Sequence, residues 1–286
     1  MNSSRAIGII GSGRSGTSLV TKELELLGVH LGGPLDFIPP DNTNPDGFWE
    51  NKHIVGIQQL IFKKLGWSWE GLNLLPPDWK SRSELVVLKE QLKKYISDNF
   101  FHKSLWGWKD PRTCSLLPIW EELLQELKMI ASYVIVIRNP LDVAHSLYRC
   151  DPRISLDHAL HIWTFRTLSS LYWTESNQRV VIHYDQMIED WEGTLKQAAN
   201  RLSIPWPQPE KQVEKEMSRI IKPQLRHSKT GEKALIESNH VSALTLNTYQ
   251  LCMSAISYPD FLTDELMHQC VKQLFEQYTG QIISLK

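Results

Sequence analysis

The sequence predicts an α/β fold in which a parallel sheet of four to five strands is flanked by helices. Three observations support this prediction. Short apolar runs alternate along the chain with longer segments of helical periodicity. A glycine loop, 11–16, joins the first apolar run to the first helical segment, as at the opening of a βαβ unit. Polar residues stand at the ends of the apolar runs, as at the carboxyl ends of parallel strands, where ligands bind.

Four apolar runs are the predicted strands: 6–10, 105–108, 133–137 and 179–184. The run 133–137 is continuously apolar, which is typical of a parallel strand covered by helices on both faces. At the carboxyl ends of the four strands stand the glycine loop, the segment 109–112, Arg138 and Tyr184.

Segments with one apolar face are the predicted helices: 17–27, 52–65, 81–99, 116–127, 140–148 and 156–173. The capping-box pattern of Ser81 and Glu84 predicts the start of the third helix, and Pro140 suits the first turn of the fifth. We expect 32–104 to be a mainly helical insertion and 232–286 to be a helical C-terminal region. The chain 1–286 is then one domain.

The composition suits a globular domain, since the 286 residues are 42% hydrophobic and 22% charged. A formal net charge of -1 argues against nucleic acid or a membrane surface as a partner. The longest apolar stretch, 129–137, is about half as long as a membrane-spanning helix, and no signal-peptide pattern is present. The four cysteines form no C-x-x-C pair, which favours reduced thiols without a metal. We therefore expect a soluble cytoplasmic protein, whose oligomeric state the sequence leaves open.

The glycine loop predicts a P-loop-like anion site. Gly11 and Gly16 keep the glycine spacing of the Walker motif G-x-x-x-x-G-K-[ST], but Thr17 stands at the lysine position and Arg14 supplies a cation inside the loop. Loop amides and the helix N-terminus hold anions. The missing lysine disfavours metal-dependent phosphoryl transfer.

The segment 13–18, G-R-S-G-T-S, resembles the 5′-phosphosulfate loop of sulfotransferases that use 3′-phosphoadenosine-5′-phosphosulfate (PAPS). It is closest to the R-S-G-T-[ST] form of the tyrosylprotein and bacterial branches. The segment 134–140, V-I-V-I-R-N-P, with Ser146 further on, resembles the family's 3′-phosphate motif. There an arginine, here Arg138, and a serine hold the 3′-phosphate. An ion pair between Arg138 and Asp142 is the alternative interpretation.

Further segments resemble the same family. Lys109 begins a K-D-P run, Tyr184 stands where a tyrosine approaches the adenine, and Arg226 stands in a basic loop that closes over the donor. Arg149 lies one position away from the place where the tyrosylprotein branch has a further arginine that contacts the donor. The resemblance implies a PAPS-binding set consisting of Arg14, Ser15, Gly16, Thr17, Ser18, Arg138, Ser146, Tyr184 and Arg226.

The resemblance also implies a catalytic base. Glu50, in the segment G-F-W-E-N, is the first candidate, because a glutamate after the first helix serves as base in the tyrosylprotein branch. A capping carboxylate is the alternative role for Glu50, and His53 and His30 are rival bases. Arg14 and Lys109 are the candidates for stabilising the sulfuryl and bridging oxygens, whereas an ion pair with Asp110 is the alternative for Lys109.

The acceptor is expected to be a small molecule with a hydroxyl or amine. The region 34–75 and the C-terminal tail would shape its pocket. Four tryptophans are candidate walls, although tryptophan is more often part of a core: Trp67, Trp69, Trp106 and Trp108. Two other functions stay open: a P-loop kinase of a small molecule, and a non-catalytic module that binds the desulfated donor, 3′-phosphoadenosine-5′-phosphate (PAP).

Overall fold

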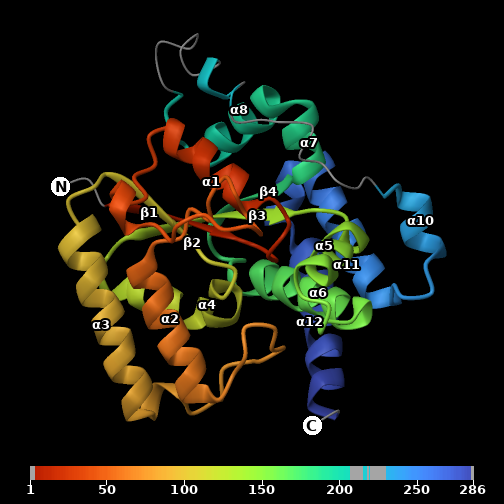
Figure 1. The fold of residues 1–286 in the computed structure, drawn as a ribbon, viewed down its shortest axis with the longest axis horizontal. Coiled ribbons are helices and arrows are strands. Elements are labelled where there is room, and N and C mark those ends of the chain that lie inside the picture. The colour runs from red at the N-terminus through yellow and green to blue at the C-terminus, as the bar shows by residue number, and fades with distance from the viewer. Residues whose placement is uncertain (1–3, 207–214, 218, 220–229, 285–286) are drawn as a thin grey trace.

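The computed structural model describes residues 4–206, 215–217, 219 and 230–284. Within this part of the chain, four parallel strands form one sheet in the order β2-β1-β3-β4 (Figure 1). The strands are β1 (Arg5–Ile10), β2 (Leu105–Lys109), β3 (Ile130–Ile137) and β4 (Gln178–His183). The predicted α/β fold with a parallel sheet flanked by helices is confirmed.

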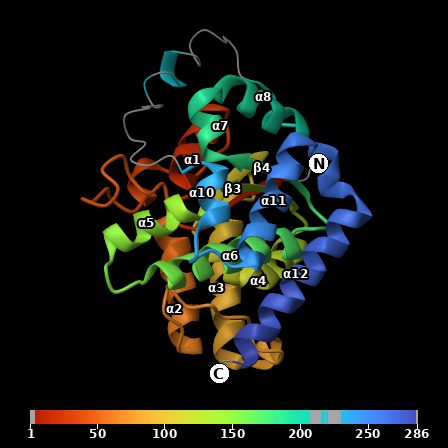
Figure 2. The same cartoon turned by 90° about the vertical axis from the view of Figure 1, so that its right-hand side faces the viewer.

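Helices cover both faces of the sheet (Figures 1 and 2). One face carries α1 (Thr17–Leu26), α7 (Tyr184–Glu189) and α8 (Trp191–Arg201). The other face carries α4 (Thr113–Glu126) and α6 (Leu156–Trp173), and α12 (Glu265–Ser284) packs on α6. The remaining described helices are α2 (Lys52–Leu65), α3 (Ser83–Phe100), α5 (Pro140–Cys150), α10 (Glu232–Glu237) and α11 (Ala243–Ser257). Short 3-10 helices span Pro34–Asp36, Trp79–Ser81 and Pro259–Thr263.

Alternation along β1 divides the core into two layers. Successive side chains of a strand point to opposite faces of its sheet. Ile7 and Ile9 therefore pack with α1 and α8, whereas Ala6 and Ile10 pack in the layer that contains α4 and α6.

No described helix is both long enough and apolar enough to cross a membrane.

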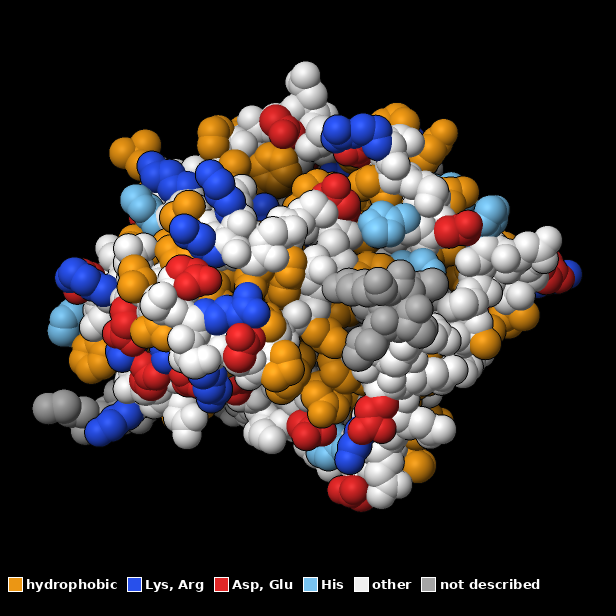
Figure 3. All heavy atoms as spheres, turned by 90° about the horizontal axis from the view of Figure 1, so that it is seen from below, with side chains coloured by type: hydrophobic (Ala, Val, Ile, Leu, Met, Phe, Trp, Pro, Cys, Tyr) orange, Lys and Arg blue, Asp and Glu red, His pale blue; other side chains and the backbone are white. Residues whose placement is uncertain are grey.

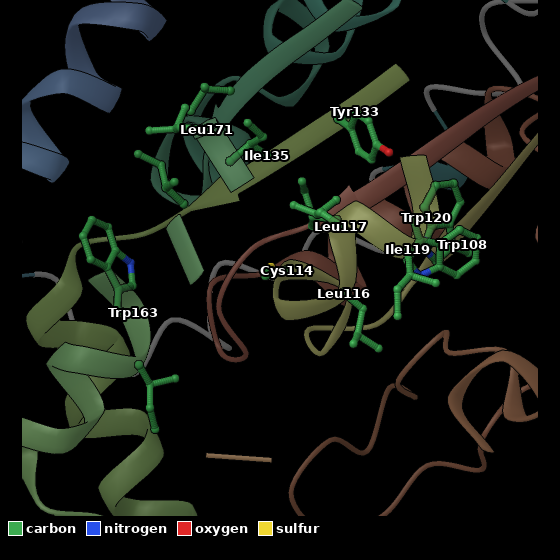
Figure 4. Close-up of a cluster of buried hydrophobic side chains, with 14 of the residues drawn as sticks. Trp108, Cys114, Leu116, Leu117, Ile119, Trp120, Tyr133, Ile135, Trp163 and Leu171 are labelled. Atoms are coloured by element: carbon green, nitrogen blue, oxygen red, sulfur yellow. The ribbon is translucent and has the colours of Figure 1, made fainter. Parts of the chain in front are cut away.

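Aromatic rings fill the layer under β2. Trp108 stacks on Trp120 with ring centroids 4.1 Å apart, and the edge of Tyr133 meets Trp108 at 6.1 Å (Figure 4). Trp106 is fully buried and stacks on Phe100 at 4.6 Å. Trp106 and Trp108 thus belong to the hydrophobic core and not to an acceptor pocket.

The start of α3 differs from the predicted capping box. Arg82 is the N-cap residue, and no side chain caps the helix. Ser81 instead ends a 3-10 turn, in which its hydroxyl donates to the Asp78 carbonyl at 2.8 Å. The local turn satisfies the hydroxyl that the capping box would have used, so α3 begins two residues later than predicted.

The parallel arrangement places the carboxyl ends of all four described strands at one edge of the sheet. Ile9 of β1 is in register with Lys109 at the end of β2 and with Val134 of β3. Ile137, the last residue of β3, is in register with His183, the last residue of β4. The glycine loop, Lys109, Arg138 and Tyr184 therefore meet at this edge, although they are widely separated in sequence.

Candidate functional site

A cavity of about 440 Å³ lies at the carboxyl edge of the sheet, and we call it the edge cavity. Its walls come from the glycine loop, α1, the segment 42–50, α5 and α7, together with the ends of β2 and β3. Among the described residues, the basic side chains that line it are Arg14, Lys22, Lys109, Arg138 and Arg149. The acidic ones are Asp46 and Glu50. The lining of the edge cavity therefore has an excess of basic residues, although the net charge of the whole chain is -1.

The glycine loop has the shape of an anion cradle. Gly11 has a φ of 140°, and a Cβ there would lie 2.3 Å from the Val136 carbonyl oxygen. Gly16 has a φ of 92°, and a Cβ there would lie 2.3 Å from a ring carbon of Tyr184. Both positions therefore require glycine. The hydroxyls of Ser12 and Ser15 are buried, and neither has a hydrogen-bond partner among the described residues. Such orphaned donors fit a loop that binds an anion.

Arg14 joins the glycine loop to the second predicted motif. It adopts the left-handed backbone region with a φ of 71°, which is uncommon for a residue other than glycine. Its Nε donates to the Ser146 hydroxyl on α5 at 3.1 Å, and its Nη1 donates to the Thr43 carbonyl at 3.1 Å. The structure thus brings the loop and the serine of the predicted 3′-phosphate motif into direct contact.

Arg138 lines the same cavity, held between a ring and a carboxylate. Its guanidinium carbon lies 4.6 Å from the centre of the Tyr184 ring, within the range of a cation–π interaction. Its Nε lies 3.7 Å from a carboxylate oxygen of Asp142, so the alternative ion pair is present. That carboxylate also accepts from the Thr230 hydroxyl at 2.6 Å. Asp142 therefore orients Arg138 at the end of β3 while the guanidinium still faces the cavity.

Glu50 and Lys109 form a buried ion pair in the cavity wall, with Nζ and Oε1 2.6 Å apart. Lys109 also donates to the Ser18 hydroxyl at 3.3 Å and to the Phe48 carbonyl at 3.2 Å. Burial raises the pKa of the Glu50 carboxyl, and the nearby charge of Lys109 opposes part of that rise. A carboxylate whose pKa is raised and which faces a cation-lined cavity has the properties of a general base.

Asp110 forms no ion pair with Lys109 and contacts Glu50 only through Arg112. Gln58 donates to Asp110 at 2.6 Å, and Arg112 contacts the same carboxylate at 2.9 Å. Arg112 then reaches Glu50 at 3.4 Å. The predicted alternative, an ion pair of Lys109 with Asp110, is therefore replaced in the structure by the pair of Lys109 with Glu50.

The two histidines proposed as rival bases lie away from the edge cavity. His53 is exposed on α2 and stacks on the Tyr95 ring at 5.0 Å. His30 lies beside Phe100, with ring centroids 5.9 Å apart. Neither lines the cavity. Arg226 lies outside the described residues.

The segment 42–49 forms a wall of the edge cavity, whereas the sequence assigned it only as part of the region 34–75, which was expected to shape the acceptor pocket. Asn44 donates to the Ser18 hydroxyl at 3.3 Å, and Ser18 donates to the Phe48 carbonyl at 3.2 Å. Trp49 has a φ of 58°, a strained conformation for a bulky residue, and Lys22 lies 5.6 Å from its ring centre. The four prolines and the polar residues of 32–51 were the only available signal.

The described residues contain no group of three or more histidine, cysteine, aspartate or glutamate side chains placed to hold a metal ion. Besides Arg14, Arg138 and Ser146, the predicted donor-binding residues Gly16, Thr17, Ser18 and Tyr184 line the edge cavity. Ser15 does not line it and is fully buried.

No protein-family model and no curated protein matches the chain. Among solved structures, the sulfotransferase domain from the Synechococcus PCC 7002 olefin synthase matches with a TM-score of 0.48 and 18% identity, over 89% of this chain and 95% of that chain. The sulfotransferase domain from the curacin biosynthetic pathway matches with a TM-score of 0.44 and 15% identity, over 96% of this chain and 98% of that chain. A likeness at these scores carries no argument about activity, so the function proposed next depends on the residues of the edge cavity.

Proposed function

We propose that the protein is a sulfotransferase that moves a sulfuryl group from PAPS to a hydroxyl or amine of a small molecule. One observation carries the proposal: Arg14 of the glycine loop contacts Ser146, which lies 132 residues further along the chain. Arg138 lines the same cavity. A donor with phosphate at both its 3′ and 5′ ends requires two neighbouring anion sites of this kind.

The residues of the edge cavity fit such a donor. The amides of the glycine loop and the hydroxyls of Thr17 and Ser18, which line the cavity, suit the 5′-phosphosulfate end, which needs donors but no metal-binding group. The planar guanidinium of Arg138 and the hydroxyl of Ser146 suit the 3′-phosphate. The ring of Tyr184 suits the adenosine part of the donor.

The proposed reaction breaks one bond and forms another at sulfur. The acceptor's oxygen or nitrogen bonds to sulfur while the bond from sulfur to the 5′-phosphate oxygen breaks, and PAP leaves with that electron pair. Glu50 takes the acceptor's proton. Lys109 and Arg14 neutralise the charge that develops on the bridging oxygen. Because a sulfuryl group carries less charge than a γ-phosphoryl group, these cations serve without the Walker lysine.

Thermal unfolding of the full chain tests the donor. PAP is expected to raise the melting temperature, and ATP with magnesium to raise it far less. Arg138→Ala is expected to weaken PAP binding by about 1.5–3 kcal/mol, the scale of a hydrogen bond to a charged group. Arg153→Ala removes an arginine whose side chain is 89% exposed, and this matched control is expected to leave PAP binding unchanged.

Transfer is then measured with radiolabelled PAPS against phenols, alcohols, sugars and amines. Equal stabilisation by ATP and PAP would contradict the donor assignment and favour the kinase. Tight PAP binding without transfer to any acceptor class would favour the non-catalytic module instead.

A further inference from the structure

Another cavity, of about 260 Å³, lies between the segment 73–79, α4, α6 and α12, and we call it the α6 cavity. None of the residues that line it lines the edge cavity. It belongs to the α4 and α6 side of the sheet, and no described residue of α12 lines the edge cavity. The chemistry proposed for the edge cavity therefore leaves the α6 cavity unexplained.

The walls of the α6 cavity are aromatic and uncharged. Trp79, Phe165, Trp173 and Phe275 line it, and no charged side chain is among its described lining residues. Phe275 is fixed in place because it stacks on the Tyr172 ring at 4.2 Å. On the face of the molecule that Figure 3 shows, hydrophobic side chains likewise gather near the middle, whereas charged ones crowd the part under α2 and α3. An aromatic wall without charge selects a neutral ring.

One polar group in these walls lacks a partner. Ser169 is 1% exposed, and its hydroxyl has no hydrogen-bond partner within the described chain. Ser169 is one of the residues that line the cavity. A buried polar group without a partner costs free energy that a bound hydroxyl recovers.

We propose that the α6 cavity binds an uncharged small molecule with one aromatic ring and one hydroxyl group, which is the chemistry of a simple phenol. A cavity of about 150 Å³ already holds benzene, so this volume accommodates a ring with a short substituent. Mostly apolar walls with a few placed polar groups are typical of small-molecule sites. The proposal goes beyond sulfuryl transfer, because it concerns residues that the edge cavity does not share.

Titration calorimetry of the full chain with p-cresol tests the site, and 4-methylbenzoate serves as a charged probe of similar shape. We expect p-cresol to bind at one site, 4-methylbenzoate to bind at least about tenfold more weakly because its carboxylate meets no counter-charge, and Ser169→Ala to weaken p-cresol about fivefold, the scale of one hydrogen bond. Ser254→Ala, a change at an exposed serine of α11, is the matched control and should have no effect.

Ser169→Phe fills the cavity and is expected to abolish p-cresol binding. If that variant does not fold, Ser169→Ala and the probe comparison still decide. Binding of p-cresol that is unchanged in Ser169→Ala, or equal binding of the benzoate, overturns the proposal. PAP titrated into the unmodified protein separates the two sites: no p-cresol binding with intact PAP binding rejects only the α6 cavity, and p-cresol binding without PAP binding rejects only the donor site.

Discussion

The ion pair of Glu50 and Lys109 concentrates the chemistry of the edge cavity in two side chains. Burial favours the protonated form of Glu50, and the ammonium of Lys109 favours the carboxylate. Because burial is the larger effect, the pKa of Glu50 is raised above its ordinary value of 4.5. A base tuned in this way releases and accepts protons closer to neutral pH than a surface glutamate does.

Glu50→Gln is expected to lower turnover by about 100-fold or more while PAP affinity is kept, because the amide cannot take the acceptor's proton. In the unmodified protein, kcat/KM should rise with pH until the raised pKa of Glu50 is passed, since only the carboxylate is active. The acidic limb of the pH profile should therefore be centred at a higher pH than the ordinary pKa of a glutamate. Steady-state rates with labelled PAPS across pH measure both effects.

The control is Glu84→Gln, since Glu84 is exposed on α3 and far from the chemistry. It should retain both the rate and the pH profile. Retained activity with an intact acidic limb in Glu50→Gln would contradict the assignment, and His53 and His30 would be tested next.

For single residues, the sequence singled out three of those that line the edge cavity: Arg14, Arg138 and Ser146. It could do so because they belong to short motifs with a fixed local geometry. It missed Lys22 of α1, and it missed Asn44, which enters the edge cavity because the segment 42–49 folds back to Ser18. That path depends on long-range contacts, which no local pattern encodes.

Among the elements, the contact of α7 with the glycine loop links the two halves of the edge cavity. Tyr184, the first residue of α7, packs against Gly16 and under the guanidinium of Arg138. The sequence predicted most elements to within a few residues, and α2 and α6 with the bounds observed. It misplaced the start of α3, where the local 3-10 turn that ends at Ser81 outweighed the capping pattern.

Gly16→Ala is expected to weaken PAP binding and to destabilise the fold, because the new methyl group meets Tyr184. Gly28→Ala provides a matched control. Gly28 has a φ of 90°, close to that of Gly16, but a Cβ there meets nothing within 4 Å. Both variants should lose about 1 kcal/mol to backbone strain. Urea unfolding should show a larger loss for Gly16→Ala, and equal losses would contradict the packing role of Tyr184.

For the whole molecule, charge is distributed unevenly between two cavities. The chain has a formal net charge of -1, yet the edge cavity is lined by five basic and two acidic described residues. The α6 cavity has no charged residue among the described ones that line it. The composition argued only against nucleic acid or a membrane surface as a partner. It gave no sign of a second, uncharged cavity, whose walls come from four separate segments.

Salt is therefore expected to affect the two cavities differently. Raising sodium chloride from low to near-molar concentration should weaken PAP binding severalfold, because counter-ions screen the basic lining. Binding of p-cresol should stay constant or tighten slightly. Calorimetric titrations of both probes at several salt concentrations measure this contrast. A PAP affinity that does not change with salt would contradict electrostatic capture at the edge cavity.

The three hydrogen bonds that Lys109 already makes have a consequence for the rate at which the edge cavity captures an anion. An ammonium has three N–H donors, and those of Lys109 already point to the Glu50 carboxylate, the Ser18 hydroxyl and the Phe48 carbonyl. Any anion that Lys109 is to bind by a hydrogen bond must displace one of these acceptors, and the bond to the Phe48 carbonyl ties Lys109 to the segment 42–49. Where that bond is the one displaced, we expect capture to include a first-order rearrangement of the segment, whose rate reaches a plateau however much anion is supplied.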